Sequence, residues 1–242
     1  SIVRGNTQRA LVRMLREAVS RFVETEMLPQ EPRWRAEHRV DYETWRAVGE
    51  AGFLLMDVPS EYGGGGGDFR HESVLYEELA RRGISGFGQG VHSIAAHYVL
   101  NYGTEEQRQR WLPRMASGEL IGAIAMTEPG AGSDLKGIRT RAVRDGDHYV
   151  INGSKTFITN GYLADLVIVV AKTDPAGGAR GTSLILVEAG TPGFSKGRKL
   201  KKVGMKAQDT SELFFEDVRV PCSNLIGEEG MGFVYLMQEL PQ

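Results

Sequence analysis

The sequence has almost no cysteine and no long hydrophobic run. Cys222 is the one cysteine among 242 residues, which excludes an internal disulfide and a metal site built from several thiolates. We expect it to be a small packed residue near a strand end. The longest apolar run, residues 166–171, is far shorter than the ~20 residues of a membrane-spanning helix. A disulfide scaffold and a helical membrane protein are therefore excluded.

The sequence also has no histidine cluster and no charge excess. The net charge of −2 and the pI of about 6.2 imply no strong attraction to nucleic acid or to an anionic membrane. The N-terminus shows neither a charged-then-apolar leader nor an Arg/Ser-rich presequence without acids, so we expect a cytoplasmic protein. Five histidines lack metal-ligand spacing and are expected to be structural or solvated: His38, His71, His92, His97 and His148.

Residues 1–120 carry helical patterns, within a composition that is ordinary for a globular protein. A stripe of apolar side chains predicts a helix over residues 7–27 that ends at Pro29. The stripe consists of Leu11, Leu15, Ala18 and Phe22. Further helices are predicted over residues 41–50, 68–81 and 86–102. The T-x-x-Q sequence at residues 104–107 is typical of a capping box for one more helix.

A run of five glycines occupies residues 63–67. Glycine-rich loops can cradle phosphate with their backbone N–H groups. This run lacks the Lys-Ser/Thr of a P-loop, and it does not lead from a clear strand into a helix. We therefore favour a flexible surface turn.

Strand patterns replace the helical ones from residue 120 onward. The Asp-Gly-Asp sequence at residues 145–147 and the Asn-Gly dipeptide at residues 152–153 are expected to be hairpin turns, because Gly, Asn and Asp accept positive φ. A helical pattern restarts at Glu228 and is cut off at the last residue. The strands are predicted at residues 120–126, 138–143, 148–151, 154–159, 166–171, 183–187, 194–196, 201–204 and 212–220.

Two polar, glycine-bearing loops lie at the ends of the first strands, at residues 126–134 (the first loop) and 157–161 (the second loop). A meander between them returns both loops to one edge of the sheet. Taken singly, Thr127 and Thr159 are compatible with strand-end caps, and Phe157 is more typical of a core residue. Their joint occurrence favours a small-molecule site.

These residues resemble the signatures of the acyl-CoA dehydrogenase family. TEPGAGSD at residues 127–134 and NGSKTFITNG at residues 152–161 are similar to its two central motifs. Segment 206–216 and the C-terminal Glu-Leu-Pro-Gln are most similar to the long-chain branch. Further matching blocks, in family order, are PSEYGG at 59–64, GMKAQDT at 204–210, FFEDVRVP at 214–221 and GEEGMGF at 227–233.

The resemblance implies an α+β multidomain fold in three parts. Residues 1–120 would form an N-terminal all-α helical domain. Residues 121–225 would form a middle β-barrel domain. Residues 226–242 would form only the first helix of a C-terminal helix bundle.

The resemblance also implies an FAD-dependent oxidation of acyl-CoA thioesters to trans-2-enoyl-CoA, in fatty-acid β-oxidation or related metabolism. A proton leaves the α carbon, and a hydride leaves the β carbon for FAD. The expected partners are the acyl-CoA substrate and an electron-transferring flavoprotein. The expected assembly is a homotetramer.

The flavin contacts implied by the resemblance lie in the two loops. Met126 and Thr127 would meet the pyrimidine side of the flavin, and Thr159 would lie near its N5 atom. Phe157 would lie against the ring, where many relatives have Trp. Gly132 would approach the FAD pyrophosphate. The implied cofactor-binding residues are Met126, Thr127, Gly132, Ser133, Phe157, Ile158 and Thr159.

The implied substrate contacts are Ser133, Arg180 and Gln242. Ser133 would meet the pantetheine arm. Arg180 matches a position near the CoA nucleotide, where a guanidinium pairs well with phosphate; a solvated loop charge is the alternative. Residues 85–90 correspond to a helix in the acyl-pocket wall, whose small residues would admit a long or branched chain and whose Phe87 would narrow it.

No catalytic residue is expected within this chain. In the family a glutamate takes the proton, and in the long-chain and isovaleryl branches it follows the position that matches Gln242. Glu239, one turn upstream, is expected to be an exposed helix residue and not the base. We therefore expect the 242-residue chain alone to be inactive and to hold FAD weakly.

Two other functions stay open on the sequence. An acyl-CoA oxidase or a related flavin monooxygenase would produce hydrogen peroxide or use oxygen with an acyl-CoA. A non-catalytic chain would bind flavin or CoA, or lend half a site to a partner.

Overall fold

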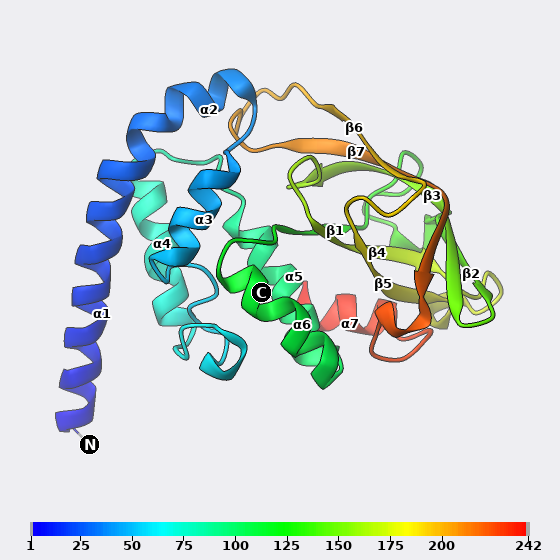
Figure 1. The fold of residues 1–242 in the computed structure, drawn as a ribbon, viewed down its shortest axis with the longest axis horizontal. Coiled ribbons are helices and arrows are strands. Elements are labelled where there is room, and N and C mark those ends of the chain that lie inside the picture. Colours follow the sequence, from blue (N-terminus) through cyan, green and yellow to red (C-terminus); the bar gives the residue numbers. More distant parts are fainter. Residues whose placement is uncertain (1, 241–242) are drawn as a thin grey trace. The chain divides into compact units, whose positions relative to one another are not determined.

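The computed structural model describes the backbone of residues 2–240 and the side chains of residues 7–240 (Figure 1). These residues form two compact units, each assembled from segments that are far apart in the sequence. The helical unit contains the chain up to Phe87 together with Pro113–Glu119 and Lys202–Gln208. The sheet unit contains Gly88–Leu112, Leu120–Lys201 and the chain from Asp209 onward.

The helical unit begins with α1 (Ile2–Phe22), which continues through a π turn (Val23–Met27) and a 3-10 turn (Leu28–Gln30) into α2 (Glu31–Glu37). Helices α3 (Tyr42–Glu50) and α4 (Phe69–Arg81) follow. The sequence pattern misses α2, because Pro29 predicts a helix end; a new helix starts shortly after it, with Pro32 in the first helical turn, where proline is favoured. Across residues 2–240, no helix is both long and apolar enough to cross a membrane.

The inward face of α1 differs from the predicted stripe. Leu11 is 55% exposed, and Ala18 is exposed as well. Helix α1 carries apolar residues on two sides, so periodicity alone does not decide which side packs. Contact with α4 decides it, and Arg16 of α1 is paired there with Glu78 (2.9 Å). The residues that α1 and its π turn bury completely are Val19, Val23 and Met27.

Helices α3 and α4 begin where predicted. Asp41 precedes α3, and its carboxylate accepts a hydrogen bond from Thr44 N (2.9 Å). Asp68 precedes α4 and forms a capping box with His71. Each cap gives a partner to N–H groups that the first helical turn leaves unpaired. Helix starts of this kind are therefore encoded locally.

The glycine run at residues 63–67 is a surface turn, as predicted, but its backbone is held firmly. The N–H groups of Gly64, Gly65, Gly66 and Gly67 donate to carbonyls of residues 55–59 at 2.9–3.2 Å. A Cβ on Gly64 would lie 2.2 Å from the carbonyl oxygen of Val58. Glycine is used there for close packing of backbone on backbone, which contradicts the predicted flexibility.

The sheet unit contains α5 (Gln89–Tyr102), α6 (Glu105–Ala116) up to Leu112, and α7 (Gly232–Glu239). The predicted capping box of α6 is present, because Thr104 and Gln107 exchange two hydrogen bonds of 3.1 Å. The strands are β1 (Gly122–Ala125), β2 (Arg141–Asp145), β3 (His148–Thr159), β4 (Leu166–Lys172), β5 (Thr182–Glu188), β6 (Phe194–Lys199), β7 (Thr210–Pro221) and β8 (Leu225–Ile226).

These strands form one eight-stranded sheet in the order β6-β7-β3-β2-β4-β5-β8, with β1 parallel to β4. A single parallel pair, Arg141 with Lys172, joins β2 to β4 in the middle of this path. The helical segment, the sheet domain and the closing helix agree with the predicted fold class.

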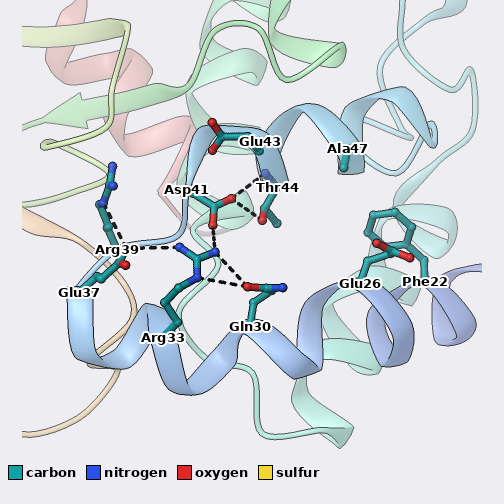
Figure 2. Close-up of a pocket in the computed structure, with 10 residues that line it drawn as sticks. All are labelled: Phe22, Glu26, Gln30, Arg33, Glu37, Arg39, Asp41, Glu43, Thr44 and Ala47. Carbon is teal, nitrogen blue, oxygen red and sulfur yellow. Dashed lines mark hydrogen bonds and ion pairs between the residues drawn. The ribbon is translucent and has the colours of Figure 1, made fainter.

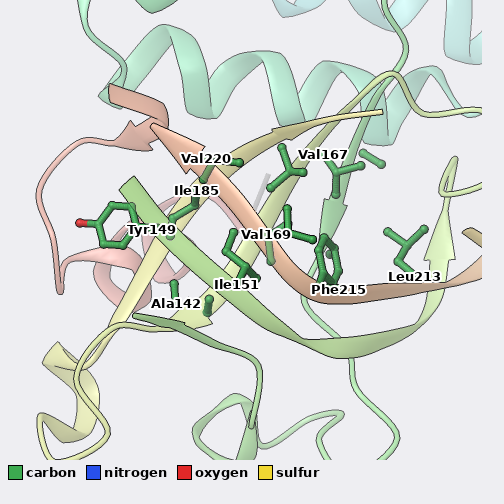
Figure 3. Close-up of a cluster of buried hydrophobic side chains, with 14 of the residues drawn as sticks. Ala142, Tyr149, Ile151, Val167, Val169, Ile185, Leu213, Phe215 and Val220 are labelled. Carbon is green, nitrogen blue, oxygen red and sulfur yellow. The ribbon is translucent and has the colours of Figure 1, made fainter. Parts of the chain in front are cut away.

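The core of the sheet unit is apolar and lies inside the curled sheet (Figure 3). Strands β4 and β5 are buried along almost their whole length, as their apolar runs predict. Cys222 packs against the edge of this core directly after β7, as expected. Labelled side chains of the core are Ala142, Tyr149, Ile151, Val167, Val169, Ile185, Leu213, Phe215 and Val220.

The dipeptide Asn152-Gly153 is not a hairpin turn. It lies inside β3, at an irregularity in the β3–β7 ladder. Asn152 exchanges two hydrogen bonds with Asp217 on β7 (2.9 and 3.0 Å). A Cβ on Gly153 would lie 2.3 Å from Thr140 Oγ1. This Asn-Gly pair therefore serves a bulge and a close contact, while the Asp-Gly-Asp turn does join β2 to β3.

Residues 201–204, predicted as a strand, are irregular. The β6–β7 ladder ends at the pair Lys199 and Ser211, and Leu200 N donates to Thr210 O (2.8 Å) just beyond it. From Lys202 to Gln208 the chain belongs to the helical unit. The chain leaves the sheet unit here, so these residues form no strand although their sequence pattern predicts one.

Candidate functional site

The first loop leaves the end of β1, and the second loop begins in the last residues of β3. Thr156 N donates to Thr127 O (2.9 Å), so the two segments lie side by side, as predicted. Glu128 and Ala131 exchange two backbone hydrogen bonds (2.9 and 3.1 Å), which close the first loop on itself. One hairpin and a long, continuous β3 produce this arrangement, in place of the predicted meander with two turns.

A buried ion pair lies beneath the first loop. Lys155 Nζ is 2.9 Å from Glu128 Oε1, and both side chains are almost completely shielded from solvent. Burial raises the pKa of Glu128, but hydrogen bonds at Thr140 and the charge of Lys155 outweigh it and leave the pKa below its ordinary value. Burial lowers the pKa of Lys155 to about 8, against the pull of Glu128. Both groups are therefore charged at pH 7.

Phe157 points outward from the second loop. Its side chain is 68% exposed and its φ is 56°, a left-handed conformation that is costly for a bulky residue. The ladder between β3 and β7 shifts register between Lys155 and Ile158, so Lys155 and Ile158 are both buried while Phe157 is not. A core position for Phe157, which is the commoner one for an isolated Phe, is wrong.

Asn160 holds the second loop from inside. Its Nδ2 atom donates to Gly88 O (2.9 Å) and Gly122 O (3.2 Å), and its backbone N donates to Asp209 O (3.1 Å). The Asp209 carboxylate accepts N–H bonds from Tyr162 (2.9 Å) and from the next residue along. Burial raises the pKa of Asp209 above its usual range, although these N–H bonds oppose it.

The outer side of the first loop offers backbone donors and open space. Within residues 2–240, the N–H groups of Thr127, Gly132 and Ser133 have no hydrogen-bond acceptor. A Cβ added to Gly130 or Gly132 would meet no protein atom within 4 Å. The packing of the chain thus does not require glycine there, and the bare backbone suits the close approach of a ligand.

The cavity drawn in Figure 2, of about 440 Å³, lies in the helical unit between α2 and α3 and is lined by charged side chains. Arg33 is bound there to Gln30 and to Asp41. Burial raises the pKa of Asp41, but hydrogen bonds from Thr44, Arg33 and Trp34 lower it to about 2. The two arginines of this cavity pair with Glu37 and Asp41, and no predicted site residue lines it.

No group of three or more His, Cys, Asp or Glu suited to a metal occurs in the part of the chain described.

The sequence matches two models of one protein family. Residues 11–119 match the acyl-CoA dehydrogenase N-terminal domain, and residues 123–218 match the acyl-CoA dehydrogenase middle domain. The chain belongs to the acyl-CoA dehydrogenase family. Both loops of the site lie within the middle-domain match.

Known relatives are similar in sequence and in fold over nearly the whole chain. It is 53% identical over 232 residues to the mitochondrial long-chain specific acyl-CoA dehydrogenase of Mus musculus, covering 95% of this chain and 54% of the mouse protein. A crystal structure of acyl-CoA dehydrogenase from Geobacillus kaustophilus is 52% identical with a TM-score of 0.93, covering 96% of this chain and 62% of that one. A glutaryl-CoA dehydrogenase from Mycobacterium smegmatis, solved in complex with FADH2, is 34% identical with a TM-score of 0.85, covering 95% and 58%. The chain spans about half the length of the curated relatives it matches.

The cofactor positions implied by the acyl-CoA dehydrogenase resemblance gather at the two adjoining segments. Met126, Thr127 and Thr159 are half-buried, and Gly132 and Ser133 are exposed. Phe157 is exposed, as described above. Ile158 is 3% exposed, and its side chain belongs to the sheet core, so only its backbone faces the loop.

Two of the three substrate positions implied by the same resemblance lie within the described residues. Ser133 lies on the first loop. Arg180 is exposed in a 3-10 turn (Gly178–Arg180), and its guanidinium has no hydrogen-bond or ion-pair partner in the described part of the chain. Gln242 lies outside the described residues. Residues 85–88 precede α5 and are not helical, and Phe87 is buried against Trp45, with 4.4 Å between the ring centroids.

Glu239 is not the exposed helix residue that the sequence predicts. It is 7% exposed, and its carboxylate accepts hydrogen bonds from Tyr102 Oη (2.8 Å) and Asn101 Nδ2 (3.1 Å), both on α5. Helix α7 packs against α5, which turns its last residue inward. Pairing across two distant helices gives no local sequence signal.

Sequence reasoning missed the residues that hold the two loops from inside: Glu128, Lys155, Asn160 and Asp209. All of them lie in the family-like motifs, in which the hydroxyl groups and glycines were the predicted site residues. A charged residue amid an apolar alternation, as at Lys155, is the signal that could have identified one of them.

Proposed function

We propose that this chain is part of an FAD-dependent enzyme that oxidises acyl-CoA thioesters to trans-2-enoyl-CoA, in fatty-acid β-oxidation or related acyl-CoA metabolism. Two neighbouring features carry this proposal: the exposed, left-handed Phe157 directly follows Thr156, whose N–H donates to Thr127 O, and the N–H of Thr127 has no acceptor within the described residues. An aromatic face and an N–H donor together fit the face and the polar edge of a flavin ring.

The residues of the two loops fit FAD. Met126 and Thr127 would hold the pyrimidine side of the ring through their backbone. Thr159 would offer its hydroxyl near N5, with the Ile158 backbone beside it, and Phe157 would cover one face. The free N–H groups of Gly132 and Ser133 would meet the pyrophosphate side. When bound, FAD supplies the hydride acceptor, and these residues orient it and exclude water.

Substrate contacts are proposed at three positions. Ser133 would meet the pantetheine arm from the exposed side of the first loop. The unpaired guanidinium of Arg180 is available to a phosphate of the CoA nucleotide. Gln242 is proposed to lie beside the acyl group, on the basis of the resemblance alone.

The proton-accepting glutamate is proposed to follow Gln242. Glu128 and Glu239 are buried carboxylates near the proposed cofactor and substrate residues, but both are held by protein hydrogen bonds. A general base needs a lone pair within reach of the substrate proton. We therefore assign neither of them this role.

The larger organisation is part of the same proposal. We propose domain limits at residues 1–120, 121–225 and 226–242, a homotetramer, and electron transfer to an electron-transferring flavoprotein. The free thiol of Cys222 accords with a reducing compartment, and a cytoplasmic location is proposed. Cell fractionation tests it against the mitochondrial placement that the mouse relative's name states, and size-exclusion chromatography tests the tetramer.

The deciding experiment measures flavin binding and turnover. The complete protein should bind FAD, reduce an electron-accepting dye with acyl-CoA, and yield 2-enoyl-CoA. Peroxide formed from acyl-CoA and oxygen would favour an oxidase. Failure of the complete protein to bind FAD would refute the proposal. The 242-residue chain alone should bind FAD weakly and turn over no substrate; robust dye reduction by it would refute the proposed position of the base.

A further inference from the structure

We propose that the buried pair Glu128–Lys155 is a positioning device that aims the Thr127 N–H toward the cofactor side of the first loop. Lys155 is then a positioning residue: it contacts protein atoms only, and it acts through the peptide between Met126 and Thr127. The inference deepens the proposed function and rests on it.

One ammonium group and one carboxylate tie three segments together. Lys155 Nζ, on β3, donates to Met126 O at the end of β1 (3.0 Å) and to Glu128 Oε1 in the first loop (2.9 Å). The Glu128 carboxylate also accepts N–H bonds from Arg139 (2.6 Å) and Thr140 (2.9 Å), just before β2. The pair therefore fixes the beginning and the turn of the first loop and ties them to the segment just before β2.

The direction of the Thr127 N–H follows from peptide geometry. A trans peptide is planar, so the carbonyl of one residue and the N–H of the next point to opposite sides. The Met126 carbonyl points to Lys155, whose side chain is 0% exposed. The Thr127 N–H must then point away from this interior, and in the described part of the chain it has no acceptor. Lys155 leaves it free for a ligand.

An apolar pair could fill the same space without this directional effect. Replacing a buried ion pair by apolar groups of similar volume is often neutral or stabilising, so stability alone does not call for two charges here. Apolar side chains cannot, however, orient the Met126 carbonyl or receive the N–H groups of Arg139 and Thr140. Orientation is the property that needs this pair.

The test compares a charge-free variant with the unaltered holoprotein. The double variant Glu128→Gln with Lys155→Met removes both charges and keeps most of the volume. Its melting temperature should stay close to that of the unaltered protein. In the flavin-free state, hydrogen exchange at Thr156 should become about tenfold faster or more, and FAD should bind about tenfold more weakly or worse. The visible circular dichroism of the bound flavin should also change.

Two controls and three outcomes make the result decisive. Lys136→Met, on the exposed 3-10 turn that directly follows the first loop, should leave all four readings unchanged. Lys155→Met alone leaves the buried Glu128 carboxylate without its cation and should unfold more easily. If this single variant does not fold, the double variant still tests the proposal. Unchanged exchange and unchanged FAD affinity in the double variant would overturn the positioning role. If the unaltered protein binds no FAD, the proposed function fails, while the exchange measurement still tests the orientation of the loop.

Discussion

At Phe157 the chain holds an aromatic ring in solvent on a left-handed backbone. A left-handed conformation costs a non-glycine residue about 1–2 kcal/mol, and an exposed ring recovers little of this by burial. Lys155, two residues away, is an equally unusual choice, because a fully buried ammonium loses its hydration. Two costs so close together indicate that this short segment is shaped for binding, and costs of this kind are common at functional sites.

Replacing Phe157 by glycine should separate stability from binding. Relief of the left-handed strain should leave the free energy of unfolding unchanged or raise it by about 1 kcal/mol, while FAD affinity falls because the ring contact is lost. Met205→Gly is the matched control, since Met205 is also exposed and left-handed (φ 47°); it should affect stability alone. Urea unfolding and FAD titration measure the two effects. A Phe157→Gly variant with full FAD affinity would contradict the ring contact.

The pKa of Lys155 predicts a rise of stability with pH. In the folded chain this pKa is about 8, below the ordinary value of 10.5, so above pH 8 the unfolded chain binds more protons than the folded one. The contribution of Lys155 to the free energy of unfolding should therefore increase from pH 8 toward 10.5, by an amount of the order of 1–3 kcal/mol.

Urea unfolding between pH 7 and 9.5 measures this rise. The upper limit avoids the pH range in which tyrosines with raised pKa values, such as Tyr149 (about 12), make the free energy of unfolding fall with pH. The Glu128→Gln, Lys155→Met variant should show a flatter pH dependence over the same range. An identical slope in both proteins would contradict the assignment.

Among the elements, α1 shows how a helix with two apolar sides is placed. Its outer side, with Leu11 and Met14, is exposed, and its inner side continues into the π turn, where Val23 and Met27 are buried. A strict 3.6-residue pattern does not continue through a π turn, because each such turn adds a residue. The partner helix α4 and this turn together set the buried line.

Two truncations in this segment should differ sharply. Met27→Ala should lower the free energy of unfolding by about 2–5 kcal/mol, because it leaves a cavity in the helical unit. Leu11→Ala should change it by no more than about 0.5 kcal/mol. Both follow from urea unfolding monitored by far-ultraviolet circular dichroism. A large loss of unfolding free energy from Leu11→Ala would show that the predicted stripe, and not the observed one, is the buried side of α1.

Two glycines of the sheet unit should respond differently to alanine. Gly153→Ala would place a Cβ 2.3 Å from Thr140 Oγ1 and 2.7 Å from its Cα, and should cost about 2 kcal/mol or more through overpacking. Gly146→Ala, at the β2–β3 turn with open space around it, should cost only the left-handed strain of about 1 kcal/mol. Thermal unfolding compares the two variants, and equal losses would show that packing at Thr140 does not matter.

Local signals predicted more of this chain than long-range ones. Asp41 and Asp68 mark helix starts by hydrogen bonds that span three residues or fewer, and the Asp-Gly-Asp turn forms its hairpin within the neighbouring strands. The inward turn of Glu239 depends on α5, about 140 residues earlier in the sequence, and the outward turn of Phe157 depends on the register of β3 with β7. No pattern within a few residues contains such information. The motifs located the two loops, but not the groups that fix them.

At the scale of the whole molecule, the proposed cofactor positions fall in one unit. The cofactor residues on the two loops and Arg180 all belong to the sheet unit, as do Glu128 and Lys155. The helical unit, with its own buried residues and its own charged cavity, contains none of them. A cofactor held at the two loops should therefore act first on the stability of the sheet unit.

FAD should stabilise the sheet unit selectively. At a concentration 100 times the dissociation constant, a ligand that binds only the folded state adds about 2.7 kcal/mol to the free energy of unfolding. Amide hydrogen exchange in β1, β3 and β4 should slow accordingly, and exchange in α1 and α3 should slow less. Equal protection of both units, or none, would contradict binding at the two loops. Exchange with and without FAD, followed by mass spectrometry, makes this measurement.

The complete burial of Lys155 gives the chain an internal reporter. Amine-acylating reagents modify lysines only where the ammonium group reaches water and loses its proton, and Lys155 has no surface in the closed site. Peptides containing Lys155 should become labelled only during the intervals in which the first loop separates from β3. The rate of that labelling therefore measures how often the first loop separates from β3, and the measurement needs no flavin, substrate or electron acceptor.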